Sequence, residues 1–361
     1  MINEAKVPPP SEPSMLTTEE RAARDAAIEE FVRKYAPGLD SDLYASMIKT
    51  VCRMSRDATS RADVKLVDKA LAELRYGFKT FAPYEDIPKV SIFGSARTKE
   101  DAPEYLQAIQ FAQRMRESNW MVITGAGDGI MKAGHGGAGV EASFGVAIRL
   151  PFEQKTNEII ADDKKLVNFK YFFTRKLMFT KEAKAVVLFP GGFGTQDEGF
   201  EVLTLVQTGK ANLVPIVMVD APGGTYWQHW RTYVKAELLH TGMISAEDMN
   251  LIKVTDDVEV AVQEILTFYR RFHSYRYVRD TLIIRLNESL PKEAILHIQE
   301  QFSDIISSGS IELTSPLPEE GDDVPEKPRL VMNFNRRSHG RLRQMINYIN
   351  TVGTPSIAAA H

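Results

Sequence analysis

The sequence has a single cysteine, Cys52, among its 361 residues, and it has no strong excess of either charge. One cysteine excludes an intrachain disulfide framework and is typical of a reducing compartment. The formal net charge of −4 gives no indication of a nucleic-acid or membrane surface. No apolar run approaches the ~18 residues of a membrane span. We therefore expect a cytoplasmic protein that has neither nucleic-acid nor membrane partners.

Several ligand-binding motifs are also missing. No G-x-x-x-x-G-K-[ST] pattern of a P-loop occurs. From Gly125 the sequence reads G-A-G-D-G-I, so Ile130 stands where the dinucleotide fingerprint requires its third glycine. No group of histidine, cysteine and aspartate has the spacing of metal ligands. These absences disfavour ATP hydrolysis and hydride transfer, and we expect neither a metal nor a bound cofactor.

The patterning divides the chain into four segments with the limits 1–16, 17–88, 89–272 and 273–361. The first is rich in proline and is expected to be a disordered tail. The second has helical spacing and begins with a capping-box pattern at Thr17 and Glu20. The fourth shows the order strand, helix, strand, strand, helix. We therefore expect an N-terminal helical extension and a small C-terminal α+β appendage on either side of a larger domain.

In the third segment, short apolar runs alternate with amphipathic helical stretches. The runs are continuously apolar, as in KAVVLFP, and do not alternate with polar residues. Such runs are typical of parallel strands that helices cover on both faces of a sheet. The fold class that we predict is α/β, a parallel sheet sandwiched by helices.

Three of the expected strands end in glycine-rich loops, at Gly94 to Ala96, Gly125 to Gly129 and Gly191 to Thr195. In such a sheet the carboxyl ends of the strands meet at one edge, where ligands bind. Two of the loops lead directly into helices, whose first turns carry unpaired N–H groups and a partial positive charge. Because glycine lets a phosphate approach the backbone closely, the three loops together favour a phosphate-bearing ligand such as a mononucleotide.

Carboxylates follow the third loop. Thr195 and Glu198 have the spacing of a capping box, so one interpretation makes Glu198 a helix cap. In the other, Glu198 stabilises an oxocarbenium-like transition state or activates water against C1′ of a bound sugar. Glu201 stands one helical turn further on, on roughly the same side.

Arg175 and Lys176 are the only charged residues in the apolar segment YFFTRKLMF. An arginine in such a setting needs an anionic partner if it is buried. Arg175 either forms a structural salt bridge or faces the ligand, where it would contact phosphate, ribose or Glu198.

Pro190 to Glu198 reads P-G-G-x-G-T-x-x-E, and the preceding helical segment carries the R-K pair. This combination resembles the signature of the LOG family, whose members are phosphoribohydrolases of cytokinin riboside 5′-monophosphates and related nucleotides and are often mislabelled lysine decarboxylases. The resemblance covers residues 89–272. It implies a Rossmann-like sandwich, a homodimer or higher homo-oligomer, and hydrolysis of a nucleoside 5′-monophosphate to free base and ribose 5-phosphate.

The resemblance also implies roles for single residues. The family's catalytic arginine and glutamate correspond to Arg175 and Glu198, and its phosphate-binding loop corresponds to the glycines and the threonine after Pro190. The substrate-binding residues that we expect are Ser95, Gly127, Glu153, Lys176, Gly192, Phe193, Gly194, Thr195, Asp197, Glu201 and Thr204.

Two other functions remain open on the sequence. The same fold would serve a non-catalytic carrier of a nucleotide or a pterin phosphate. A decarboxylase would need pyridoxal phosphate on a lysine, for which Lys132, Lys176 and Lys181 are available. Separately, the basic segment from Phe334 to Gln344 is either a helix start paired with the acidic residues 319–323 or a second anion or subunit contact.

Overall fold

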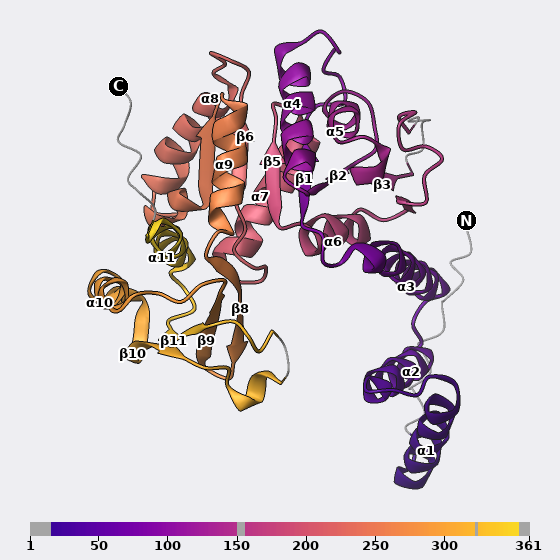
Figure 1. The fold of residues 1–361 in the computed structure, drawn as a ribbon. Coiled ribbons are helices and arrows are strands. Elements are labelled where there is room, and N and C mark those ends of the chain that lie inside the picture. Colours follow the sequence, from indigo (N-terminus) through magenta and orange to yellow (C-terminus); the bar gives the residue numbers. More distant parts are fainter. Residues whose placement is uncertain (1–15, 150–155, 322–323, 354–361) are drawn as a thin grey trace, which may run out of the picture. The chain divides into compact units, whose positions relative to one another are not determined.

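The computed structural model describes residues 16–149, 156–321 and 324–353 (Figure 1). The expected disordered tail lies almost wholly outside these residues, and so does Glu153. The chain forms two compact units, Met1–Arg75 and Tyr76–His361. The boundary between them in the sequence falls within helix α3 (Arg61–Phe81).

The first unit contains α1 (Thr18–Tyr35), α2 (Ser41–Arg56) and most of α3. The capping box at its start is confirmed: the Thr17 N–H donates to Glu20 Oε2 over 2.8 Å, and the Glu20 N–H donates to Thr17 Oγ1 over 3.2 Å. Ile28 and Val32 of α1 pack against Ala45 of α2 in a small apolar cluster. Helices α1 and α2 are therefore joined by a narrow core.

A seven-stranded parallel sheet organises the second unit, with the strand order β4-β3-β2-β1-β5-β6-β7. The strands are β1 (Lys89–Phe93), β2 (Met121–Thr124), β3 (Ser143–Ile148), β4 (Leu166–Phe169), β5 (Ala185–Leu188), β6 (Ile216–Val219) and β7 (Ile252–Thr255). The chain builds outward from β1 to β4 on one side and then from β5 to β7 on the other. The order therefore reverses between β1 and β5, which is the place where doubly wound sheets bind ligands.

Helices cover both faces of this sheet (Figure 1). They are α4 (Pro103–Glu117), α5 (Ile130–Ala138), α6 (Phe172–Glu182), α7 (Phe193–Gln207), α8 (Tyr226–Tyr233) and α9 (Val258–Phe268). Val90 and Ile92 of β1 enter the core formed with α4, α5 and α9. The residue between them, Ser91, points to the opposite face, where its hydroxyl donates to the Phe179 carbonyl of α6 over 3.1 Å. Because both faces are buried, the strands need apolar residues at nearly every position.

A second, antiparallel sheet has the order β10-β11-β9-β8. Its elements are β8 (Phe272–Val278), β9 (Thr281–Leu286), α10 (Lys292–Gln301), β10 (Ile306–Thr314), β11 (Arg329–Phe334) and α11 (His339–Thr351). The predicted fold class is thus confirmed: a Rossmann-like parallel sheet between helices, with a helical extension before it and a small α+β appendage after it. The domain limits drawn from the sequence stay predictions.

The basic segment from Phe334 to Gln344 leads from β11 into α11, while Asp322 and Asp323 of the acidic loop lie outside the described residues and a subunit contact stays a prediction. Its charged side chains do not gather at one site and do not pair with the described residues of the acidic loop. Arg341 forms an ion pair with Asp304 over 2.9 Å, and Arg343 forms one with Glu264. His339 is buried against Gly209. These contacts hold the turn after α10, helix α9 and the loop after α7 to α11, so the segment has a packing role.

Candidate active site

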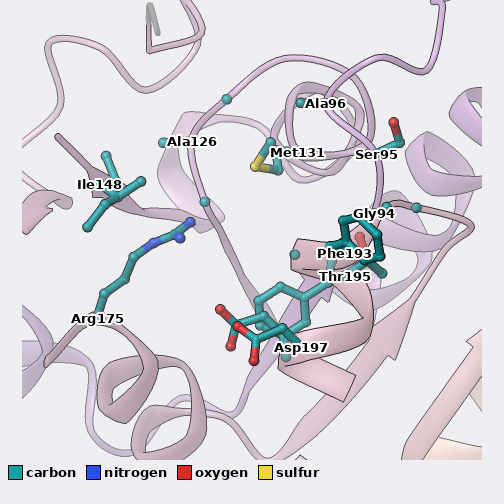
Figure 2. A pocket seen from close by; sticks show the side chains of 18 of the residues that line it. Gly94, Ser95, Ala96, Ala126, Met131, Ile148, Arg175, Phe193, Thr195 and Asp197 are labelled. Carbon is teal, nitrogen blue, oxygen red and sulfur yellow. The ribbon is translucent and has the colours of Figure 1, made fainter. Parts of the chain in front are cut away.

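A cavity of about 1110 Å³ opens where the strand order reverses. The three glycine-rich loops that follow β1, β2 and β5 line it, as the sequence predicts. Figure 2 shows the guanidinium of Arg175 near Ala126 and Met131 on one side, with Phe193 and Thr195 on the other. Of the expected site residues, those that line the cavity are Ser95, Gly127, Arg175, Gly192, Phe193, Gly194, Thr195, Asp197 and Glu198.

The start of α7 differs from the capping-box interpretation. The helix begins at Phe193 with Gly192 as its N-cap, so Thr195 already lies inside the first turn and Glu198 lies inside the helix. No described side chain caps this end of the helix. The free N–H groups of the first turn therefore face the cavity with the positive end of the helix dipole, which is the arrangement that binds phosphate.

The three loops are fixed to one another by backbone contacts. The Ser95 N–H donates to the Pro190 carbonyl over 3.1 Å, and the Ile130 N–H donates to the Ser95 carbonyl over 3.1 Å. Gly191 lies where these loops meet, and a Cβ added there would come within 2.1 Å of Thr195 Oγ1 and 3.0 Å of the Ser95 nitrogen. A glycine is therefore needed at position 191 so that the Thr195 side chain and the Ser95 backbone can lie this close to the loop. A Cβ at Gly192, by contrast, would meet nothing within 4 Å.

This contrast gives a prediction for stability. Gly191→Ala should lower the free energy of unfolding by about 1–3 kcal/mol, because the methyl group forces the stiff Thr195 side chain and the Ser95 backbone apart. Gly192→Ala, the matched control, should change it by less than about 0.5 kcal/mol, which is the usual range for an open site. Urea unfolding followed by circular dichroism measures both values, and equal effects of the two substitutions would contradict this account of the loop.

Arg175 extends from α6 across the end of the sheet. Its Nε donates to the Val146 carbonyl over 2.9 Å, and its guanidinium lies 5.1 Å from the ring centre of Phe179. A Cβ at Gly125 would come within 2.5 Å of its Nη2, so the second glycine loop leaves room for this side chain. Burial lowers the pKa of Arg175, and the charge of Glu198 opposes that shift. The arginine is held by a backbone carbonyl and keeps part of its guanidinium toward the cavity.

Glu198 is only 8% exposed although it lines the cavity. Among the described residues, no side chain or backbone group donates a hydrogen bond to its carboxylate. Burial raises the pKa of Glu198 to about 7, against the opposing charges of Lys176 and Arg175. A carboxyl group that titrates near neutral pH inside a ligand cavity is suited to proton transfer.

Three expected binding residues do not line the cavity. Lys176 of α6 lies 2.7 Å from Asp197 Oδ2 and 2.5 Å from Glu201 Oε2, so it joins α6 to α7. The pKa of Lys176 is raised because these two ion pairs outweigh the effect of its burial. Thr204 is exposed, and its hydroxyl donates to the Phe200 carbonyl over 2.8 Å. A direct substrate contact by Lys176, Glu201 or Thr204 therefore has no support in this geometry.

A buried polar network that the sequence analysis missed supports the second loop. His135 of α5 is fully buried, and its Nε2 donates to the Phe144 carbonyl over 3.1 Å. Its Nδ1 lies 3.2 Å from the side-chain amide of Asn157, which donates to the Gly127 carbonyl over 2.9 Å. Burial lowers the pKa of His135, so the ring is neutral at pH 7. This network fixes the Gly127 loop, although neither His135 nor Asn157 lines the cavity.

Several other residues that line the cavity were not predicted, and three of them are polar side chains of interest. Arg97 and Arg149 line it, and so does Tyr226 of α8. The Tyr226 hydroxyl donates to the Gly191 carbonyl over 2.5 Å and accepts from Gln196 Nε2 over 2.7 Å. Arg97 directly follows the first glycine loop, so the sequence alone could have indicated that it lies at the cavity. Tyr226 had no such signal because its helix was not expected.

A comparison with known protein families finds a match within the Rossmann-like domain. Residues 125–265 match the family described as "Possible lysine decarboxylase", the label carried by the LOG family. The Rossmann-like domain belongs to the LOG family. A comparison with curated proteins gives no match. In the part of the chain that the structure describes, no group of three or more histidine, cysteine or acidic residues is placed to hold a metal ion, and no helix is long and apolar enough to cross a membrane.

Several solved structures resemble the LOG domain at low identity. The molybdenum cofactor binding protein of Rippkaea orientalis is 16% identical, with a TM-score of 0.36, over 50% of this chain and 96% of its own. The molybdenum cofactor carrier protein of Chlamydomonas reinhardtii is 20% identical, with a TM-score of 0.35, over 50% and 98%. DNA processing protein A of Streptococcus pneumoniae is 12% identical, with a TM-score of 0.37, over 66% and 91%. None of these likenesses carries a ligand or an activity over to this chain.

Proposed function

We propose that the LOG domain hydrolyses the N-glycosidic bond of a nucleoside 5′-monophosphate, of the AMP or cytokinin riboside monophosphate class, and releases free base and ribose 5-phosphate. The observation that carries this proposal is the position of Glu198. It lies in the cavity on the same helix, α7, whose uncapped first turn faces that cavity. A phosphate held at the helix start brings the sugar close to this carboxylate.

The phosphate site is formed by backbone groups at Gly192, Gly194 and Thr195. Nothing lies within 4 Å of a Cβ built at Gly192 or at Gly194, so both are open to a ligand. Phe193 between them is 96% exposed and offers its ring at the cavity edge. The positive charge of Arg175 in the same cavity adds attraction for the phosphate or for the ribose oxygens.

In the proposed reaction, water attacks C1′ while the bond from C1′ to the base nitrogen breaks with its electron pair. Ionised Glu198 stabilises the positive charge that develops on the sugar and takes a proton from the attacking water. The departing base nitrogen takes a proton from solvent, Glu198 returns its proton to solvent afterwards, and the water oxygen becomes the C1′ hydroxyl of ribose 5-phosphate. Because the second turn of α7 holds Glu198 in a fixed position, little reorganisation is needed during this step.

Two alternatives have less support. A decarboxylase needs a lysine for pyridoxal phosphate, yet Lys132, Lys176 and Lys181 do not line the cavity and each forms an ion pair. A passive carrier of a nucleotide or a pterin phosphate gains nothing from a buried carboxylate without hydrogen-bond donors, since its burial costs free energy. The carrier predicts binding without turnover.

Incubation with a panel of nucleoside monophosphates, including AMP and isopentenyladenosine monophosphate, tests the proposal. Released base is followed by chromatography, and ribose 5-phosphate is measured in equal amount. Binding of a nucleotide without release of base from any member of the panel would favour the carrier. The expected homodimer stays a prediction.

The pH dependence of kcat/KM should follow the ionisation of the Glu198 carboxyl group. Because the ionised form is the active one and burial raises the pKa of Glu198 to about 7, kcat/KM for AMP should rise about tenfold per pH unit below pH 7 and level off above it. Steady-state rates between pH 5 and pH 9 measure the profile. A rate that falls as the pH rises through 7 would mean that the protonated carboxyl is the active form.

A further inference from the structure

A second cavity, of about 820 Å³, lies away from the first, at the amino-terminal ends of β5 and β6. Its wall is built from the loops before these strands, from α6 and α7, and from β8 of the antiparallel sheet. The two sheets therefore enclose a space that the proposed hydrolysis does not use.

Two lysines in this cavity have no ion-pair partner among the described residues. Lys184 precedes β5, and its backbone is fixed because the Lys184 carbonyl accepts from the Tyr269 hydroxyl over 2.5 Å. Lys210 follows α7, and its N–H donates to the Leu205 carbonyl over 2.8 Å. Both lysines line the cavity. Their backbones are fixed by these hydrogen bonds, and their ammonium groups form no ion pair with a described residue.

The acidic side chain in the same lining does not cancel this charge. Glu201 lies 2.5 Å from Lys176 Nζ, so its carboxylate is already paired. Lys181, a further lining cation, is paired with Glu182 over 2.7 Å. Burial and the positive charges of Lys327 and Lys184 lower the pKa of His273, which also lines the cavity. The cavity therefore has an excess of positive charge.

Aromatic rings also line this cavity. Tyr275 and Tyr277 of β8 stand with their ring centres 6.2 Å apart, nearly perpendicular, and Phe173 of α6 contributes a third ring. The Tyr275 hydroxyl accepts from the Leu213 N–H over 3.2 Å, so this ring is fixed to the loop before β6. Rings of this kind stack on a planar ligand.

We propose that this second cavity binds a small aromatic ligand that carries several negative charges, with its anionic groups on Lys184 and Lys210 and its ring against Tyr275, Tyr277 and Phe173. The ligand class includes nucleoside polyphosphates. Neither cations nor aromatic rings alone define the site, since lysines hold anions as point charges and the rings select a planar group.

Calorimetric titration with three probes tests the proposal: ATP supplies ring and charge, tripolyphosphate supplies charge alone, and adenosine supplies the ring alone. We expect ATP to bind at least ten times more tightly than either of the other two. Equal affinity for tripolyphosphate would overturn the role of the rings, and equal affinity for adenosine would overturn the role of the lysines. Absence of ATP binding would overturn the whole proposal.

Variants separate this site from the first cavity. Lys184→Glu with Lys210→Glu should weaken ATP binding more than tenfold, and Gly194→Glu, which repels phosphate at the start of α7, should leave the second-site affinity unchanged. Lys253→Glu with Lys292→Glu is the charge-matched control, since both lysines are exposed and outside the lining. Loss of ATP binding in Gly194→Glu alone would place ATP in the first cavity and overturn the inference. Because this readout is binding, it does not depend on hydrolysis.

Discussion

Glu198→Gln should lower kcat for base release from AMP by about 100- to 10,000-fold, which is the range for a positioned acid–base or electrostatic group. The amide keeps the shape of the side chain but neither takes a proton from water nor balances positive charge on the sugar. Nucleotide affinity should change only slightly, because the proposed phosphate site uses the N–H groups at the start of α7. Chromatography of released base and calorimetry with AMP measure the two quantities separately.

Glu293→Gln on α10 is the matched control, since it makes the same chemical change at an exposed position outside the cavity. It should have unchanged kcat and KM. If Glu198→Gln keeps full activity while its AMP affinity falls, Glu198 binds substrate and does not act in the chemical step. If the Gln variant and the wild type both bind AMP and neither releases base, the chain is a carrier.

The same substitution has a consequence for stability. The pKa of Glu198 is raised from 4.5 to about 7 on folding, so the folded state binds the proton more tightly than the unfolded state. This contribution to stability is complete below pH 4.5, falls as the pH rises toward 7 and is absent above it. Glu198→Gln removes the titration, and its unfolding free energy should therefore vary less than that of the wild type between pH 4.5 and pH 7.

Two capping-box patterns show how far the sequence predicts local structure. Thr17 and Glu20 form the box, whereas Thr195 and Glu198 have the same spacing and do not. The difference lies in what precedes them. Gly191 and Gly192 let the helix begin early, and Thr195 Oγ1 packs against Gly191. The spacing of Thr195 and Glu198 cannot predict this contact. The contact depends on the loop after β1, which holds the third glycine loop in place through the hydrogen bond from Ser95 to Pro190.

The glycine loops were predictable as a group because parallel strands bring their carboxyl ends to one edge. The continuous apolar runs therefore predict the parallel sheet, and the parallel sheet in turn predicts a cavity at the edge where its carboxyl ends meet. Tyr226 and Asn157 were not predictable, since they reach Gly191 and Gly127 from 35 and 30 residues further along the chain. His135 lies close to the second loop in sequence, in α5, but nothing in the sequence marks its role. A lone histidine in a helix is not distinguished by pattern from a surface residue. The family resemblance implied a substrate contact for Lys176, but this side chain points from α6 toward α7, where it pairs with Asp197 and Glu201.

Glu320→Ala should lower the free energy of unfolding by about 3–5 kcal/mol, the usual result of removing one member of a buried ion pair. The Glu320 side chain is fully buried between two guanidinium groups of the antiparallel sheet. Its Oε1 lies 2.9 Å from Arg285 Nη2, and its Oε2 lies 3.2 Å from Arg329 Nε. Without the carboxylate, two buried positive charges face each other across β9 and β11.

Glu319→Ala is the matched control, because Glu319 is the adjacent residue and is exposed; its effect should stay within about 0.5 kcal/mol. Burial alone would raise the pKa of Glu320, but hydrogen bonds from Arg329, the Leu317 backbone and Arg285 outweigh it and lower the pKa below 4.5. Its contribution to stability is therefore present above pH 4.5 and is lost as the pH falls through the lowered value. Urea unfolding at pH 7 and pH 3 should show the difference between wild type and Glu320→Ala shrinking at the lower pH. A constant difference would mean that packing of the side chain, and not its charge, holds β9 and β11 together.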